Sequence, residues 1–144
     1  MSESRSWPAH LDPIVEEFSS CFDSMERYEL LFLYAKRHPS PLPPEEWDES
    51  NQVHGCQSRA HVICSLDKGG KFFLRGGADA QIVQGLMAIT AMAVNGMSPS
   101  EVADLTPDFA DSMGIRSSLT PSRANGFLNM FKRVKAEALL LSGG

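Results

Sequence analysis

Residues 60–75 read Ala60-His61-Val62-Ile63-Cys64-Ser65-Leu66-Asp67-Lys68-Gly69-Gly70-Lys71-Phe72-Phe73-Leu74-Arg75. Every second side chain from Ala60 to Leu66 is apolar, and this alternation is typical of a strand that buries one face. The four residues from Asp67 to Gly70 are of types that favour a tight turn, and residues 71–75 supply the returning strand. The stretch therefore predicts an antiparallel hairpin. Residues 51–54 are expected to add a shorter strand before it.

A long apolar helix is predicted directly after the hairpin. Gly76-Gly77 is expected to end the sheet, and Asp79 is expected to cap the helix that follows. Apolar residues and one threonine recur at helical spacing over a broad face: Ile82, Val83, Leu86, Met87, Ile89, Thr90, Ala93 and Val94. A face of this width predicts a central helix in the core of the protein.

Two helices and a connector are predicted on the N-terminal side of the hairpin. Residues 11–18 carry apolar side chains at helical spacing, and Asp23 begins a capping box for a second helix. His38-Pro39 ends that helix, because proline disfavours a helical conformation at the residue before it. Residues 39–44 contain four prolines, so they are expected to form an extended connector.

Further helices are predicted on the C-terminal side. Ser98 begins a capping box with proline at the first helical position, and this helix is expected to run to about Leu105. Another helix is expected over residues 107–113, and Thr120-Pro121 opens the last one. The order of elements predicts an α+β fold, in which a small antiparallel sheet of about three strands packs against helices.

The composition is that of one soluble domain, predicted to occupy residues 1–144 with its core in about residues 11–138. The chain has 144 residues, of which 42% are hydrophobic and 22% charged, and no apolar run approaches the about 20 residues of a membrane-spanning helix. Its net charge of −5 argues against a nucleic-acid partner. The N-terminus lacks the apolar segment of a secretory signal, so a cytoplasmic location is expected. A plastid or another organelle is left open.

Cys56 differs from the other two cysteines because it lies on a bend between predicted strands, in His54-Gly55-Cys56-Gln57-Ser58-Arg59. Gly55 allows backbone angles that other residues avoid, so it can present the next side chain at the tip of a tight loop. His54 and Arg59 would favour the thiolate if they face the sulfur. Cysteine is often only a small buried apolar residue, and this motif alone leaves that interpretation open.

The remaining cysteines are expected to be inert. Cys21 and Cys64 are predicted to fill the core, and the spacing of the three cysteines contains no Cys-x-x-Cys pair. Reduced thiols are therefore favoured over a disulfide framework.

Two other kinds of chemistry are weighed for the cysteine and histidine residues. A metal site would draw on His54, Cys56, His61 and Cys64. The strand geometry disfavours it, because His61 and Cys64 are separated by an odd number of residues and leave opposite faces. A hydrolase would use Cys56 as nucleophile and His54, His10, His38 or His61 as base. No oxyanion hole or substrate cleft is evident from the sequence.

Three segments together resemble the SufE family, the sulfur acceptors of cysteine desulfurases. They are Val53-His54-Gly55-Cys56-Gln57-Ser58, then Asp79-Ala80-Gln81-Ile82-Val83-Gln84-Gly85-Leu86, and Leu119-Thr120-Pro121-Ser122-Arg123-Ala124-Asn125-Gly126. Their order and spacing agree with the family over about residues 11–138. The resemblance implies the SufE/IscU-like fold, a small antiparallel sheet on helices, which iron–sulfur scaffold proteins also share.

The resemblance also implies a role and a site. Family members take persulfide sulfur from a cysteine desulfurase and pass it to the iron–sulfur cluster scaffold complex, acting as sulfur carriers in transpersulfidation and not as independent catalysts. Cys56 matches the acceptor cysteine, and Arg123 matches an arginine that lies near it in the family and is expected to assist by its charge. The partner-facing residues are expected to be His54, Gly55, Gln57, Ser58, Arg59 and Asp79. No cofactor is expected on this chain, because pyridoxal phosphate belongs to the desulfurase.

The predicted complex is transient, and the free chain is expected to be a monomer or a weak dimer with no membrane partner. The alternative function is a metal or iron–sulfur scaffold that uses Cys56 and His54.

Overall fold

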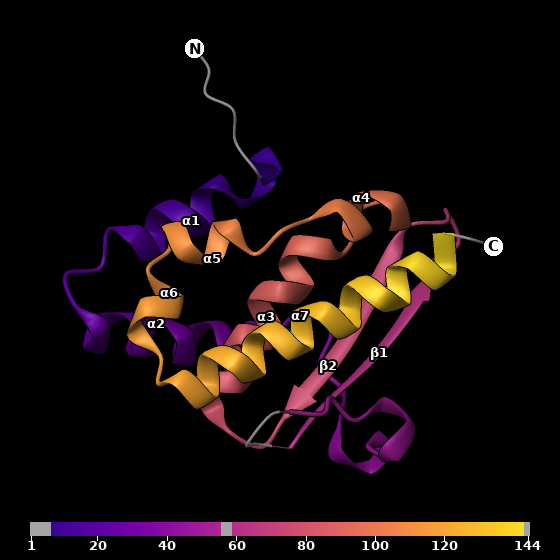
Figure 1. The fold of residues 1–144 in the computed structure, drawn as a ribbon, viewed down its shortest axis with the longest axis horizontal. Coiled ribbons are helices and arrows are strands. Elements are labelled where there is room, and N and C mark those ends of the chain that lie inside the picture. Colours follow the sequence, from indigo (N-terminus) through magenta and orange to yellow (C-terminus); the bar gives the residue numbers. More distant parts are fainter. Residues whose placement is uncertain (1–6, 56–58, 143–144) are drawn as a thin grey trace.

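The computed structural model describes residues 7–55 and 59–142 as helices packed around one β-hairpin, which confirms the α+β prediction (Figure 1). The elements in chain order are η1 Ala9–Leu11, α1 Asp12–Ser19, α2 Ser24–Lys36, η2 Pro44–Glu46, η3 Glu49–Asn51, β1 Ala60–Leu66, β2 Phe72–Ala78, α3 Gln81–Val94, α4 Pro99–Asp104, α5 Asp108–Ser112, α6 Ile115–Ser118 and α7 Pro121–Ser142. None of these helices is long and apolar enough to cross a membrane.

The hairpin forms where the alternating pattern predicts it. β1 and β2 pair antiparallel, from Ala60 opposite Ala78 to Leu66 opposite Phe72. The Asp67 side chain closes the turn, since its Oδ1 accepts the backbone N–H groups of Gly69 and Lys71, each at 2.9 Å. The predicted turn residues thus form the turn.

The second strand continues beyond the point where we expected it to end. Gly76-Gly77 lies within β2, which runs to Ala78. A Cβ atom at Gly76 would collide with the side chain of Met87 on α3, and one at Gly77 would collide with the carbonyl oxygen of Leu42. The two glycines therefore let α3 and the proline-rich connector approach the strand closely.

The predicted third strand at residues 51–54 is corrected by the structure. The described part of the chain has a sheet of two strands, and next to it only isolated bridges, Gln52 with His61 and Pro41 with Gly76. Asp48 turns the backbone before the expected strand, because its side chain accepts the Ser50 N–H while Asn51 Oδ1 accepts the Asp48 N–H. This capping box produces η3 in place of an extended segment.

The central helix is α3, as its broad apolar face predicts. Ten of its 14 residues are buried: Val83, Gly85, Leu86, Met87, Ala88, Ile89, Thr90, Ala91, Ala93 and Val94. Gly85 allows α2 to lie against it, because a Cβ there would collide with the Leu31 carbonyl oxygen. The long helix α7 contacts both β1 and α3 (Figure 1) and buries Phe127, Met130, Phe131 and Val134.

The helix ends follow the predicted caps in two of three cases. Asp23 Oδ1 accepts the Glu26 N–H at 3.0 Å, and the Ser98–Glu101 capping box is present. The predicted cap at Asp79 is wrong, because α3 begins at Gln81 after Ala80 and has no side-chain cap. The predicted helix at residues 107–113 is matched by α5, and α6 follows it after Gly114.

Candidate functional site

The loop between Val53 and Ala60 is the candidate site, and its two ends meet at the edge of the hairpin. The Val53 N–H donates to the Ala60 carbonyl oxygen at 2.8 Å, and both residues are buried. Cys56, Gln57 and Ser58 lie outside the described residues. The site is therefore built from its stem, which is His54 and Gly55 on one side and Arg59 on the other.

Gly55 meets two requirements that only glycine satisfies together. Its φ of +83° lies in the left-handed region, as the bend predicted. Its carbonyl oxygen accepts a hydrogen bond from Asn129 Nδ2 on α7 at 3.1 Å, and a Cβ at Gly55 would collide with that amide nitrogen. His54 is exposed beside it.

Arg133 holds the chain before Gly55. Its Nη1 donates to the Gln52 carbonyl oxygen and its Nη2 to the Ser50 carbonyl oxygen, each at 2.8 Å. Its Nε donates to Glu137 Oε2 at 3.0 Å, which orients the guanidinium. Asn129 and Arg133 are one helical turn apart, so α7 presents both to the same segment.

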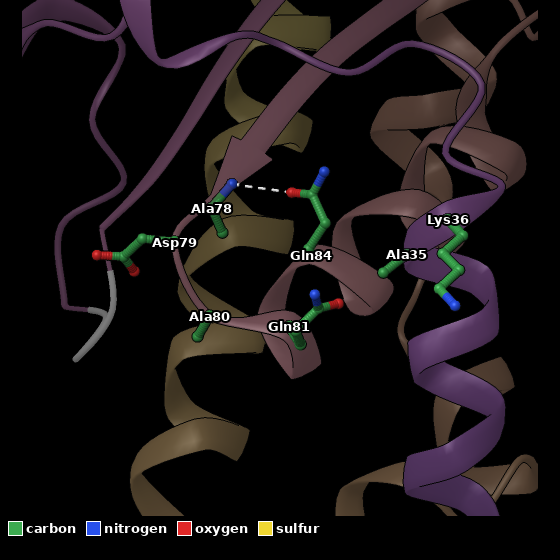
Figure 2. Close-up of a pocket in the computed structure, with 7 residues that line it drawn as sticks. All are labelled: Ala35, Lys36, Ala78, Asp79, Ala80, Gln81 and Gln84. Atoms are coloured by element: carbon green, nitrogen blue, oxygen red, sulfur yellow. Dashed lines mark hydrogen bonds between the residues drawn. The ribbon is translucent and has the colours of Figure 1, made fainter.

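Asp79 holds the chain on the other side of Cys56. Its Oδ1 accepts the Arg59 N–H at 3.0 Å, and its own N–H donates to the Arg59 carbonyl oxygen at 3.0 Å. In Figure 2 the carboxylate points away from Gln81 and Gln84 of α3. The side chain that we expected to cap a helix therefore anchors the loop.

A stack of three side chains begins at the loop stem and consists of Arg59, Trp47 and His61. The Arg59 Cζ lies 5.1 Å from the Trp47 ring centroid, and the Trp47 and His61 rings are stacked at 4.8 Å with an interplanar angle of 13°. His61 Nδ1 and Asn51 Oδ1 are 2.7 Å apart, so Nδ1 is used in this contact. Burial lowers the pKa of His61, which favours a neutral imidazole.

Arg123 lies in the first turn of α7, six residues before Asn129. Its backbone N–H donates to Thr120 Oγ1 at 3.3 Å. Its Nη1 is buried and has no hydrogen-bond partner in the described part of the chain. The structure thus gives the guanidinium no described carboxylate that would explain it as half of an ion pair.

The surroundings of the two described cysteines disfavour the thiolate form. Burial, with a smaller contribution from Glu137, raises the pKa of Cys64 to about 12, and the residue packs against the core as predicted. Burial also raises the pKa of Cys21, assisted by Glu26. Cys21 is half-buried, and its sulfur lies 3.7 Å from the Glu17 carbonyl oxygen. The prediction that Cys21 fills the core is therefore wrong.

A cleft of about 310 Å³ lies beside Asp79 (Figure 2). Its lining comes from the end of α2, the end of β2 and the start of α3: Ala35, Lys36, Ala78, Asp79, Ala80, Gln81 and Gln84. Gln84 Oε1 accepts the Ala78 N–H at 2.9 Å, so that side chain is used in the fold. Among the described residues, no group of three or more His, Cys, Asp or Glu side chains is arranged to hold a metal ion.

Comparison with known proteins assigns the chain to a family. Residues 12–138 match the family model described as SufE, Fe-S metabolism associated domain. The chain belongs to the SufE family. It is therefore associated with iron–sulfur metabolism.

Two SufE-like proteins and one solved structure match nearly all of the chain. The chain is 41% identical over 137 residues to an uncharacterized SufE-like protein of Synechocystis sp., covering 95% of this chain and 85% of that protein. It is 34% identical to SufE-like protein 1, chloroplastic/mitochondrial, of Arabidopsis thaliana, covering 93% of this chain and 36% of that protein. A solution structure of a hypothetical protein from Thermus thermophilus superposes with a TM-score of 0.78 at 26% identity, covering 96% and 99% of the two chains.

Three residues that contact the loop stem or the segment before it were not singled out from the sequence: Trp47, Asn129 and Arg133. Asn129 and Arg133 have i, i+4 spacing on the polar side of a helix whose apolar residues were recognised. That spacing could have identified a shared face. It could not have shown that backbone carbonyl groups more than 70 residues away would lie against it.

Proposed function

We propose that this SufE protein accepts sulfur on Cys56 from a cysteine desulfurase and passes it to the iron–sulfur cluster assembly machinery. One observation carries the proposal: the three residues from Cys56 to Ser58 join two stems that are each held by hydrogen bonds, at Gly55 and at Arg59. A nucleophile that must approach a persulfide on another protein needs a backbone that is held in place on both sides of it.

The transfer step is a thiol exchange. The Cys56 thiolate attacks the terminal sulfur of the desulfurase persulfide, forming a new S–S bond as the old one breaks. The desulfurase cysteine leaves as a thiolate, and Cys56 carries the persulfide. The exchange needs no external oxidant or reductant, since one thiolate and one persulfide are consumed and one of each is produced.

The other thiols support Cys56 as the acceptor. Thiolate is the attacking form, and burial raises the pKa of Cys64 to about 12. Burial raises the pKa of Cys21 as well. Neither described cysteine is therefore activated for attack at neutral pH.

The desulfurase supplies the pyridoxal phosphate that weakens the C–S bond of free cysteine, and this chain supplies the acceptor. Arg123 is proposed to assist by its charge, since its buried Nη1 has no described partner. The docking surface centres on the loop and includes His54, Gln57 and Arg59. A carrier must dissociate after each transfer, so the interface is expected to bury about 1,200 Å² or less.

Intact-mass measurement after incubation with a desulfurase and cysteine tests the proposal. The wild-type chain should gain the mass of one sulfur atom, and Cys56→Ser should gain none while keeping its melting temperature. Cys21→Ser is the matched control and should gain sulfur like the wild type. Sulfur gain by Cys56→Ser would contradict the proposal, and stoichiometric iron or zinc that Cys56→Ser loses would favour a scaffold that uses Cys56 and His54.

A further inference from the structure

We propose that Asn129 and Arg133 are positioning residues for sulfur transfer, which fix the stem that carries the acceptor cysteine. The inference rests on the proposed function of Cys56. It assigns a role in that reaction to a face of α7 that lies more than 70 residues away in the sequence.

Asn129 acts on the peptide group next to the acceptor. The oxygen that it binds at 3.1 Å is the carbonyl of Gly55, and this carbonyl belongs to the peptide bond between Gly55 and Cys56. A peptide group is planar, so a hydrogen bond to its oxygen restrains the direction in which the chain continues. Asn129 thus restrains the Gly55 carbonyl, which is the last described group before Cys56.

Arg133 binds carbonyl groups that precede Gly55 in the same segment. Its Nη1 and Nη2 donate to the Gln52 and Ser50 carbonyl oxygens in a forked arrangement, and its Nε donates to Glu137. Hydrogen bonds from a charged donor are stronger than neutral ones, and the planar guanidinium fixes their geometry. Together the two side chains hold three carbonyl groups between residues 50 and 55.

These contacts are separate from the core. The apolar side of α7 is buried through Phe127, Met130 and Val134, whereas Asn129 and Arg133 are only half-buried. Removing the Asn129 amide therefore leaves the packing of α7 in place. It should release the stem, so that fewer encounters with the desulfurase place the two sulfurs within reaction distance.

Asn129→Asp keeps the size of the side chain and replaces the N–H donor with a carboxylate oxygen, and Asn129→Ala removes the donor without adding a charge. Asn125→Ala and Asn129→Ala form a matched pair, since Asn125 is an exposed asparagine one turn earlier on α7. For each variant three quantities are measured on the full chain: the single-turnover transfer rate at saturating desulfurase, the melting temperature and the rate at which iodoacetamide alkylates Cys56.

We expect Asn129→Asp and Asn129→Ala to lower the maximal transfer rate about tenfold. The melting temperatures of both variants and the alkylation rate of Asn129→Ala should stay at the values of Asn125→Ala. Arg133→Gln should also lower the maximal transfer rate. Arg133→Lys should have a rate between those of Arg133→Gln and the wild type, because lysine keeps the charge but lacks the forked donors.

The inference is overturned if Asn129→Asp transfers sulfur as fast as Asn125→Ala, or if transfer falls only in proportion to a loss of folded protein. Failure of the proposed function has a different signature, since the wild type would then gain no sulfur, or Cys56→Ser would gain it.

Discussion

The two edges of the β1–β2 hairpin are covered in different ways. At the β2 edge, buried residues of the connector pair with the strand backbone: Leu42 N–H donates to the Gly76 oxygen at 2.8 Å, and Ser40 Oγ donates to the Leu74 oxygen at 2.5 Å. At the β1 edge, the segment that leads to Cys56 has one backbone pair, from the Val53 N–H to the Ala60 oxygen at 2.8 Å, and is also held by the half-buried side chains of Asn129 and Arg133. The comparison shows that buried backbone pairing dominates at one edge and side chains of α7 contribute at the other, which under the proposed function positions the acceptor loop.

Among substitutions outside Cys56, Gly55→Ala should have the largest effect on transfer, because it places a Cβ at the tightest contact of the β1 edge. The substitution forces a Cβ into the left-handed region at φ +83° and against Asn129. We expect the transfer rate to fall more than about tenfold and the free energy of unfolding to fall by about 1–2 kcal/mol. Denaturant unfolding and single-turnover transfer measure the two effects.

Gly70→Ala is the matched control for that change. Gly70 has φ +78°, and a Cβ there would meet nothing within 4 Å. It should lower stability by a similar backbone contribution and leave sulfur transfer unchanged. Equal transfer rates for Gly55→Ala and Gly70→Ala would remove the distinction between the two edges.

Cys64→Ser tests the interior of the hairpin between the two edges. The hydroxyl replaces a sulfur that packs against the core, so the free energy of unfolding should fall by about 1–3 kcal/mol if the group finds no partner. Sulfur acceptance per folded molecule should be unchanged. A well-folded Cys64→Ser variant that accepts no sulfur would assign the chemistry to the strand and not to the loop.

His38 should make the stability of the β2 edge depend on pH. Its Nδ1 accepts the Ser40 N–H at 3.1 Å, and burial lowers its pKa from 6.5 to about 4. Between these two values the unfolded chain binds the proton and the folded chain does not. The stability is therefore complete above about pH 6.5 and decreases as the pH falls toward 4.

Urea unfolding at pH 7 and pH 5 measures this effect in the wild type and in His38→Asn. The wild type should lose on the order of 1–2 kcal/mol more than the variant between the two pH values. Equal losses in both proteins would show that His38 does not titrate as its burial indicates.

The sequence predicts elements that depend on local patterns and misses contacts between distant segments. The alternation in residues 60–66 and the apolar face of α3 identify the hairpin and the central helix, because both patterns reflect burial within one element. Gly76-Gly77 was expected to end a strand, since glycine usually weakens one. Only the packing of Met87 and Leu42 shows why β2 needs glycine there.

In the candidate site, too, residues with a local signal were predicted from the sequence and residues that act through distant contacts were not. Gly55 was recognised because its backbone freedom is a property of the residue itself. Asp79 was recognised but given the wrong role, because an acidic residue before a helix resembles a cap, whereas its carboxylate binds the Arg59 N–H. Asn129 was missed because nothing in the sequence of α7 records that the Gly55 carbonyl lies beside it.

Mapping the transferred sulfur to a peptide tests the central claim most directly. The wild-type chain is incubated with a desulfurase and isotopically labelled cysteine, then alkylated, digested and analysed by mass spectrometry. We predict that the label resides as a persulfide on the peptide that contains Cys56. Label on the Cys21 or Cys64 peptide, or no label while the desulfurase is active, would contradict the account.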